Sequence, residues 1–144
     1  MKRVCPGCAA NNRIPLERLG DRPKCGRCKA PLPSVDAPIA LKSEAEFDAL
    51  IGQRSLPVLV DFWAAWCGPC RMVAPEVTKL AQARAGHLLV AKVDTEALPG
   101  IARRFEISGI PTIILYRDGA EAKRISGAMS AERIARALDL PVSA

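Results

Sequence analysis

The chain has 144 residues, of which 49% are hydrophobic and 25% charged, and a formal net charge of +6 at pH 7. This length suits one ordinary domain with a small appendage, and so apolar a composition excludes a largely disordered protein. A membrane-spanning protein is also excluded, because no stretch approaches the roughly 20 apolar residues that span a bilayer.

The first feature along the chain is a pair of Cys-x-x-Cys motifs, Cys5 with Cys8 and Cys25 with Cys28, separated by sixteen residues. This spacing is typical of a zinc site built from four thiolates. Residues 1–31 are too few to bury a core of their own, so a bound metal best accounts for their folding. We therefore predict a zinc-ribbon module with a structural Zn²⁺; two disulfides, or extra redox pairs, are the alternative.

The same end of the chain carries most of the positive charge, with eight Lys or Arg against three acids in residues 1–38. A basic module can contact nucleic acid. Four bound thiolates and a zinc ion would reduce its charge from +5 to about +3, which disfavours that partner. The basic start MKRVC (1–5) lacks the following apolar run of a signal peptide, so we expect a cytoplasmic protein whose cysteines bind metal or exchange electrons.

Beyond this module the chain changes character. Three prolines crowd the stretch from Ala30 to Leu41, so residues 32–41 are predicted to be a linker and residues 42–144 a second domain. Ser43 and Glu46 have the spacing of a capping box, which marks the first helix of that domain. Hydrophobic periodicity predicts, in chain order, a helix over 44–52, a buried strand over 57–64, a helix over 67–84, a parallel strand over 88–94, a helix over 96–105, a hairpin over 112–127 and a helix from Ser130.

A third Cys-x-x-Cys motif, WCGPC (66–70), falls where the strand over 57–64 leads into the next helix. Unpaired backbone N–H groups and the helix dipole favour a thiolate at such a helix start, so Cys67 is the predicted nucleophile. Cys70 lies three residues later on the same side of the helix and within disulfide reach, which predicts a resolving thiol. Pro69 fits this position, because the first helical turn tolerates a missing N–H.

The segments VDFWAAWCGPC (60–70), Lys92, GIPT (109–112) and Gly127 together resemble the thioredoxin family, in its order and spacing over residues 39–144. With the cysteine-rich module ahead of them, they are similar to the zinc-containing bacterial thioredoxins of the thioredoxin 2 type. The resemblance implies an α/β thioredoxin fold, with a central mixed sheet of four or five strands flanked by helices. It also implies a dithiol-disulfide cycle of Cys67 and Cys70 acting on protein disulfides.

Further residues receive roles from the resemblance. Asp61 lies in an apolar strand, where its pKa should be raised, and would be the buried proton acceptor for Cys70. Lys92 would be its cationic neighbour, and Pro111 a cis-proline facing the disulfide. The docking rim for the substrate would be formed by Trp66, Gly68, Pro69, Gly109, Ile110, Gly127 and Ala128.

These expectations describe a protein-disulfide reductase that binds no organic cofactor and is recycled by an NADPH-dependent thioredoxin reductase. A disulfide oxidase or isomerase would share the fold but normally needs an oxidising compartment. A zinc-ribbon adaptor that targets the redox domain to a partner is the other alternative. The sequence leaves open whether the zinc site is purely structural or also senses oxidation.

Overall fold

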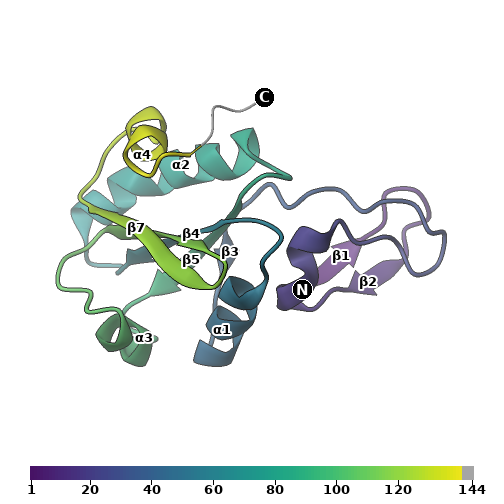
Figure 1. Ribbon diagram of the computed structural model, residues 1–144, viewed down its shortest axis with the longest axis horizontal. Helices are drawn as coiled ribbons and strands as arrows, with labels where there is room; N and C mark the ends of the chain where they lie inside the picture. Colours follow the sequence, from purple (N-terminus) through teal and green to yellow (C-terminus); the bar gives the residue numbers. More distant parts are fainter. Residues whose placement is uncertain (141–144) are drawn as a thin grey trace.

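The computed structural model describes residues 1–140 as a mixed sheet covered by helices on both faces, with a small two-stranded ribbon at one end (Figure 1). None of the helices in this described part has the length and apolarity needed to cross a membrane. The elements are, in chain order, β1 (Lys2–Val4), β2 (Asn11–Arg13), the 3-10 helix η1 (Leu16–Asp21), β3 (Ile39–Ala40), α1 (Glu44–Gly52), β4 (Val58–Trp63), α2 (Gly68–Ala83), β5 (Leu89–Asp94), α3 (Pro99–Arg104), β6 (Thr112–Arg117), β7 (Ala120–Ser126) and α4 (Ala131–Ala137).

The central sheet has five strands in the order β3-β5-β4-β6-β7. Strands β3, β4 and β5 run parallel, whereas β6 pairs antiparallel with both β4 and β7. The predicted mixed sheet of four or five strands flanked by helices is therefore confirmed. The ribbon is a separate antiparallel pair of β1 and β2.

Alternate side chains of β4 point to opposite faces of the sheet, as in any strand. Val58, Val60 and Phe62 belong to the hydrophobic cluster that includes α1 and α3, whereas Leu59 belongs to the cluster with α2 and α4. Asp61 has the same parity as Leu59 and so lies on the face that α2 covers. This placement puts the buried carboxyl on the same side of the sheet as the helix that begins after Cys67.

The segment expected to be a linker contributes to the fold. Ile39–Ala40 forms β3 and pairs with β5, and Leu32, Val35 and Leu41 are buried. A strand of two residues is too short to show an alternating pattern in the sequence. The chain between the ribbon and α1 therefore lies along the larger domain.

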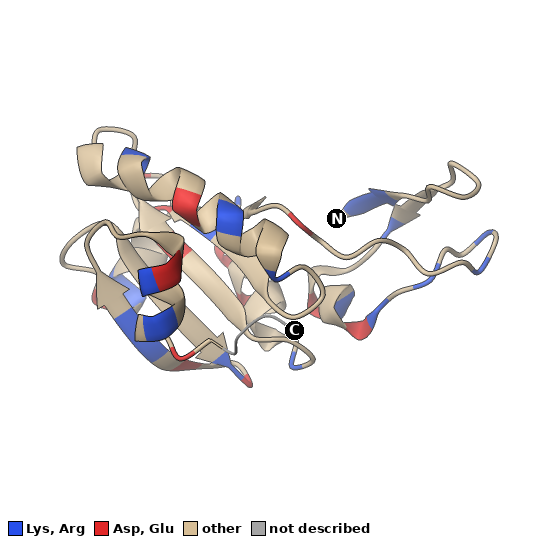
Figure 2. Cartoon of the chain, turned by 90° about the horizontal axis from the view of Figure 1, so that it is seen from above, with Lys and Arg blue, Asp and Glu red and all other residues tan. Residues whose placement is uncertain are grey.

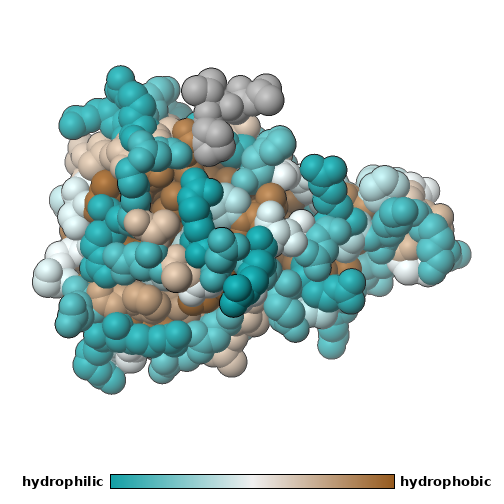
Figure 3. Space-filling view, in the orientation of Figure 1, coloured by the Kyte–Doolittle hydropathy of each residue, from teal (hydrophilic) through white to brown (hydrophobic). Residues whose placement is uncertain are grey.

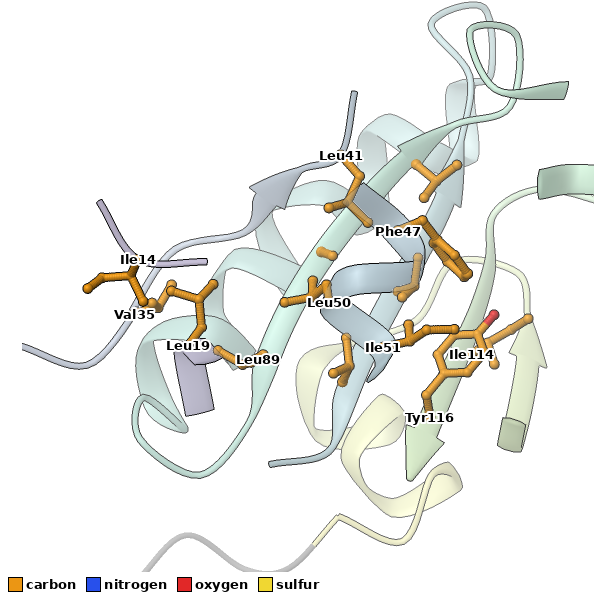
Figure 4. Close-up of a cluster of buried hydrophobic side chains, with 14 of the residues drawn as sticks. Ile14, Leu19, Val35, Leu41, Phe47, Leu50, Ile51, Leu89, Ile114 and Tyr116 are labelled. Carbon is orange, nitrogen blue, oxygen red and sulfur yellow. The ribbon is translucent and has the colours of Figure 1, made fainter. Parts of the chain in front are cut away.

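The ribbon also shares a core with the larger domain. Ile14, Leu19 and Val35 from the N-terminal part lie in one cluster with Leu50 of α1 and Leu89 of β5 (Figure 4). A hydrogen bond from the Ser55 hydroxyl to the Asp21 carboxylate adds a polar contact between η1 and the loop before β4. Residues 1–31, which are too few for an independent core, thus complete theirs against the neighbouring domain.

Gly20 determines how closely η1 approaches that loop. A Cβ at Gly20 would contact Oε1 of Gln53 and lie 3.0 Å from Cβ of Ser55, and two hydrogen bonds with the backbone of Leu56 hold the Gln53 amide in place. We expect Gly20→Ala to lower the free energy of unfolding by about 1–3 kcal/mol, because the neighbouring groups cannot move freely. Urea denaturation measures this change.

Gly52→Ala, in the last turn of α1, is the matched control. A Cβ at Gly52 meets nothing within 4 Å, and alanine has the better helix propensity, so this substitution should raise stability by at most about 1 kcal/mol. Equal effects of the two substitutions would contradict a tight interface at Gly20.

Candidate active site and metal centre

Cys67 and Cys70 form a disulfide at the start of α2, with their Cα atoms 5.3 Å apart. Cys67 is the N-cap residue of the helix, and its Sγ accepts a hydrogen bond from the backbone N–H of Cys70 at 3.2 Å. Both residues are almost fully buried, at 4% and 3% exposure. The helix start therefore presents an N–H group to the sulfur of Cys67, an arrangement that stabilises negative charge there in the reduced form.

The turn between β4 and α2 holds these cysteines in place. The N–H of Cys67 donates to the carbonyl of Ala64 at 3.1 Å, which closes the chain just after the strand ends. Pro69 lies in the first turn of α2, where its missing N–H removes no helical hydrogen bond. The buried strand and the stripe of α2 formed by Val73, Val77 and Leu80 fix the two ends of this turn.

Asp61 is completely buried in β4, and within residues 1–140 neither of its carboxylate oxygens has a hydrogen-bond partner. Burial raises the pKa of Asp61 to about 6, and the positive charge of Lys92 partly opposes this rise. Lys92 lies opposite Asp61 in the register of β4 and β5, and its Nζ lies 5.0 Å from the ring centroid of Trp63. A buried carboxyl with free lone pairs can hold or accept a proton near neutral pH.

The loop before β6 lies against the disulfide. The peptide bond between Ile110 and Pro111 is cis, and the carbonyl oxygen of Ile110 lies 3.7 Å from Sγ of Cys67. The carbonyl of Pro111 accepts a hydrogen bond from the N–H of Gly127 at 2.9 Å. The fold thus gathers Cys67, the cis-proline loop and the start of the segment after β7 into one site.

A shallow cavity of about 170 Å³ adjoins this site. Trp66 forms part of its wall; the side chain is 67% exposed, and its indole N–H donates to Glu96 at 2.9 Å. The cavity is lined by Trp66, Thr95, Ile107, Ser108, Gly109 and Ile110. Of the predicted docking rim, Trp66, Gly109 and Ile110 therefore line one hollow.

The other predicted rim residues, Gly68, Pro69, Gly127 and Ala128, are exposed.

Sequence reasoning missed three residues that line the hollow, Thr95, Ile107 and Ser108, because they lie in loops with no pattern that would single them out. It also missed Met72, which is 70% exposed on α2. Met72 could have been found, because it is an apolar residue outside the buried stripe of its helix.

Four further cysteines form a second cluster in the ribbon. All four Sγ atoms of Cys5, Cys8, Cys25 and Cys28 lie within 4.8 Å of one another, with Cys5–Cys28 and Cys8–Cys25 separations of 3.6 Å. A tetrahedral zinc site with Zn–S bonds of about 2.3 Å has sulfurs about 3.8 Å apart, so this cluster has the right size.

The surroundings of Cys25 also suit a metal ligand. Hydrogen bonds from the backbone N–H of Cys28 and from the side chain of Asn12 lower the pKa of the Cys25 thiol to about 6. The N–H of Arg27 adds a third contact to this sulfur at 3.4 Å. These donors stabilise a thiolate, which is the form that binds zinc.

Comparisons with known proteins cover both parts of the chain. Residues 38–140 match the family model described as thioredoxin, and residues 4–30 match the one described as thioredoxin 2, N-terminal. Thioredoxin C-3 from Corynebacterium nephridii is 41% identical over 136 residues, which are 94% of this chain and 92% of that protein.

Two further comparisons concern the larger domain. A bifunctional thioredoxin reductase/thioredoxin from Mycobacterium leprae is 45% identical over 96 residues, which are 67% of this chain and 21% of that protein. A solved structure of a mutant thioredoxin from Halobacterium salinarum is similar with a TM-score of 0.66 and 32% identity, over 74% of this chain and 89% of that one.

Proposed function

Since this chain belongs to the thioredoxin family, we propose that Cys67 and Cys70 are the two thiols with which it acts as a protein-disulfide reductase. Cys67 is the nucleophile and Cys70 the resolving thiol in this proposal. One observation carries the assignment: the sulfur of Cys67 caps the N-terminus of α2 and accepts the N–H of Cys70. That environment lowers the cost of a thiolate at Cys67.

The exchange proceeds in two steps that together move two electrons to the substrate. The Cys67 thiolate attacks one sulfur of a protein disulfide, which forms a mixed disulfide and releases the other substrate sulfur as a thiolate that takes up a proton. The Cys70 thiolate then attacks Sγ of Cys67, which breaks the mixed disulfide and releases the second substrate thiol. The chain is left with the Cys67–Cys70 disulfide.

Asp61 is proposed to take the proton of Cys70 before the second step. Its carboxyl lies on the sheet face that α2 covers, and its pKa of about 6 leaves it mostly ionised and able to accept a proton at pH 7. Lys92 is proposed to limit the rise in this pKa. Pro111 and the hollow beside Trp66 are proposed to hold the substrate chain next to Sγ of Cys67.

Asp61→Asn should stabilise the fold at pH 7 while slowing turnover. The pKa of Asp61 is about 6 in the folded chain and 3.8 in the unfolded chain, so folding favours the protonated acid. Ionisation of Asp61 therefore lowers the free energy of unfolding by up to about 3 kcal/mol above pH 6 and not at all below about pH 3. The stability gain of the variant should therefore appear as pH rises from 4 to 6, to be measured by urea denaturation. Turnover should fall about 100-fold, because the proton acceptor is lost.

Asp48→Asn is the control for this substitution, because Asp48 is an exposed acid paired with Arg104. Asp48→Asn should leave turnover unchanged, and it should alter the pH dependence of the free energy of unfolding much less than Asp61→Asn does. A gain in stability for Asp61→Asn with full turnover at pH 7 would show that Asp61 is a buried acid without a role in proton transfer.

The ribbon cysteines Cys5, Cys8, Cys25 and Cys28 are proposed to bind a structural Zn²⁺, supported by the size of the sulfur cluster and the N–H donors around Cys25. The metal would cross-link two short loops that have little core of their own.

The protein is proposed to act in the cytoplasm, because cysteines that bind a metal as thiolates, and are not joined in disulfides, persist in a reducing compartment.

The proposed recycling partner is an NADPH-dependent thioredoxin reductase, supported by the similarity to a protein named as a bifunctional thioredoxin reductase/thioredoxin. The test is insulin disulfide reduction, followed as NADPH oxidation in the presence of thioredoxin reductase and as insulin precipitation with dithiothreitol. We expect activity in both assays. Activity with dithiothreitol alone would contradict the reductase partner, and inactivity in both would contradict the proposed function of the cysteines.

A further inference from the structure

A second, larger cavity lies between the ribbon and the central sheet, with a volume of about 350 Å³. Its walls come from the ribbon, from the extended segment 31–35 and from the turn at Ala85–His87 after α2. This volume falls in the range of small-molecule sites, which bury most of a ligand of modest size.

The floor of this cleft is apolar. Leu19, Leu32, Val35 and Leu89 line it, and each of these residues is less than 10% exposed. These side chains belong to the cluster that joins the ribbon to the sheet, and Leu19, Val35 and Leu89 are labelled in Figure 4. The cleft therefore offers a ligand a hydrophobic surface that the fold already holds in place.

The rim of the cleft is basic. Arg3, Arg22 and His87 line it, and no carboxylate lies among the lining residues within 1–140. Arg3 donates one N–H to the carbonyl of Pro33 at 2.5 Å, whereas no hydrogen bond or ion pair engages the side chain of Arg22 within the described residues. Basic residues on β1 and on the chain after η1 are blue in Figure 2.

The walls of the cleft approach each other closely at one point. Gly86 has a φ of +85°, and a Cβ there would lie 3.0 Å from Oγ of Ser34 on the opposite wall. Only glycine combines this backbone conformation with so close an approach at little cost. Glycine at this position therefore lets the turn at Ala85–His87 lie close to the segment 31–35 across the cleft.

We propose that this cleft binds a small organic phosphate, with an aromatic or aliphatic body on the apolar floor and the phosphate at Arg22, Arg3 and His87. Guanidinium groups are well suited to phosphate, because they donate paired N–H groups to its oxygens. A lining that combines basic side chains with an apolar floor fits this class better than a neutral apolar ligand or an inorganic ion alone.

This site would be separate from the redox site. Leu56 and Leu89 lie where the parallel strands β4 and β5 begin, whereas Cys67 follows the end of β4. The 16 residues of α2 separate Cys67 from the turn at Ala85–His87, a length of about 24 Å. In Figure 3 the ribbon extends from one end of the molecule, at the right of the view.

The probe for this proposal is 1-naphthyl phosphate, titrated into the ¹⁵N-labelled, zinc-loaded full chain while amide chemical shifts are recorded. We expect saturable shifts at the non-proline amides of residues 32–35 and at those of residues 85–87, and none at the non-proline amides of residues 66–70. Naphthol, which has only the apolar body, and inorganic phosphate, which has only the anion, should each bind at least about tenfold more weakly.

Arg22→Gln should weaken binding of 1-naphthyl phosphate about tenfold, because a charge-assisted contact is lost. Arg13→Gln is the matched control: it removes the same charge from an exposed position on β2, outside the cleft, and should change the affinity less than about twofold. His87→Gln provides a second lining variant, and its affinity should also fall. Amide spectra away from the cleft confirm that each variant is folded.

Several results would overturn the proposal. These are an absence of saturable shifts at the cleft, equal binding of naphthol and 1-naphthyl phosphate, or equal affinity of Arg22→Gln and Arg13→Gln. All three variants should retain full insulin reduction, so a failure of the phosphate site is distinguishable from a failure of the redox site.

Discussion

Cys67→Ser is expected to lose insulin reduction down to the background rate, a fall of at least about 1,000-fold. The serine hydroxyl is a far weaker acid than a thiol and is not ionised near neutral pH, and it cannot form the mixed disulfide. The N–H of Cys70 that meets the sulfur at 3.2 Å therefore has no thiolate to stabilise. NADPH oxidation coupled through thioredoxin reductase measures the loss.

Cys70→Ser should behave differently, although turnover is lost in both variants. Cys67 can still attack a substrate, but no second thiolate is present to release it, so a covalent complex should accumulate. Mass spectrometry without reductant detects this adduct on Cys67. An adduct that forms with Cys67→Ser instead, or with neither variant, would reverse or remove the assigned roles of nucleophile and resolving thiol.

Two of the three Cys-x-x-Cys motifs are nearly identical tetrads, CGRC (25–28) and CGPC (67–70), and the contrast between them shows what the sequence could predict. Cys67 follows a buried strand and precedes the apolar stripe of α2, and this local pattern predicted the disulfide at a helix start. Cys25 has neither a buried strand before it nor an apolar helical stripe after it, but the Cys5–Cys8 pair lies upstream at the spacing of a zinc site. The neighbouring elements therefore separated the predicted metal-binding tetrad from the predicted redox tetrad. The only residue that differs between them, Arg27 or Pro69, carries little structural information.

The structure adds a physical reason for the clustering of the four ribbon cysteines that the spacing alone did not provide. Ala9 and Lys29 each follow the second cysteine of a pair, and both have positive φ angles, of 61° and 64°. Their N–H groups donate to the carbonyls of Cys5 and Cys25, so the two loops close in the same way. Neither residue is a glycine, so the repeated conformation could not be predicted from residue types.

Long-range packing was the part that the sequence could not supply. The strand β3 lies in a stretch of prolines with no alternation, and its pairing with β5 depends on a segment about fifty residues away. The hollow beside Trp66 likewise combines loops that are distant along the chain. The cis peptide at Pro111 was expected only through the resemblance, because an isolated X-Pro bond favours trans.

Removal of the zinc ion proposed for the ribbon is expected to unfold the ribbon while the redox site keeps working. Structural zinc contributes about 10–16 kcal/mol to the folding of zinc-finger peptides, and strands β1 and β2 of three residues each cannot replace it. Chelation should make the amides of β1, β2 and η1 exchange with solvent at least about 100-fold faster. Hydrogen exchange followed by mass spectrometry measures this change in the zinc-loaded and chelated protein.

The effect should extend to the stability of the whole chain. Leu19, Leu32 and Val35 cover part of the core beside Leu89, and each contributes roughly 1.5–3 kcal/mol when buried. Their exposure should lower the free energy of unfolding by several kcal/mol, whereas insulin reduction at 25 °C should persist because Cys67 lies beyond the far end of α2. Cys28→Ser, which removes the exposed member of the proposed ligand set, should reproduce both results. Unchanged exchange in β1 and β2 after zinc has been removed would show that packing against the sheet, and not the metal, holds the ribbon.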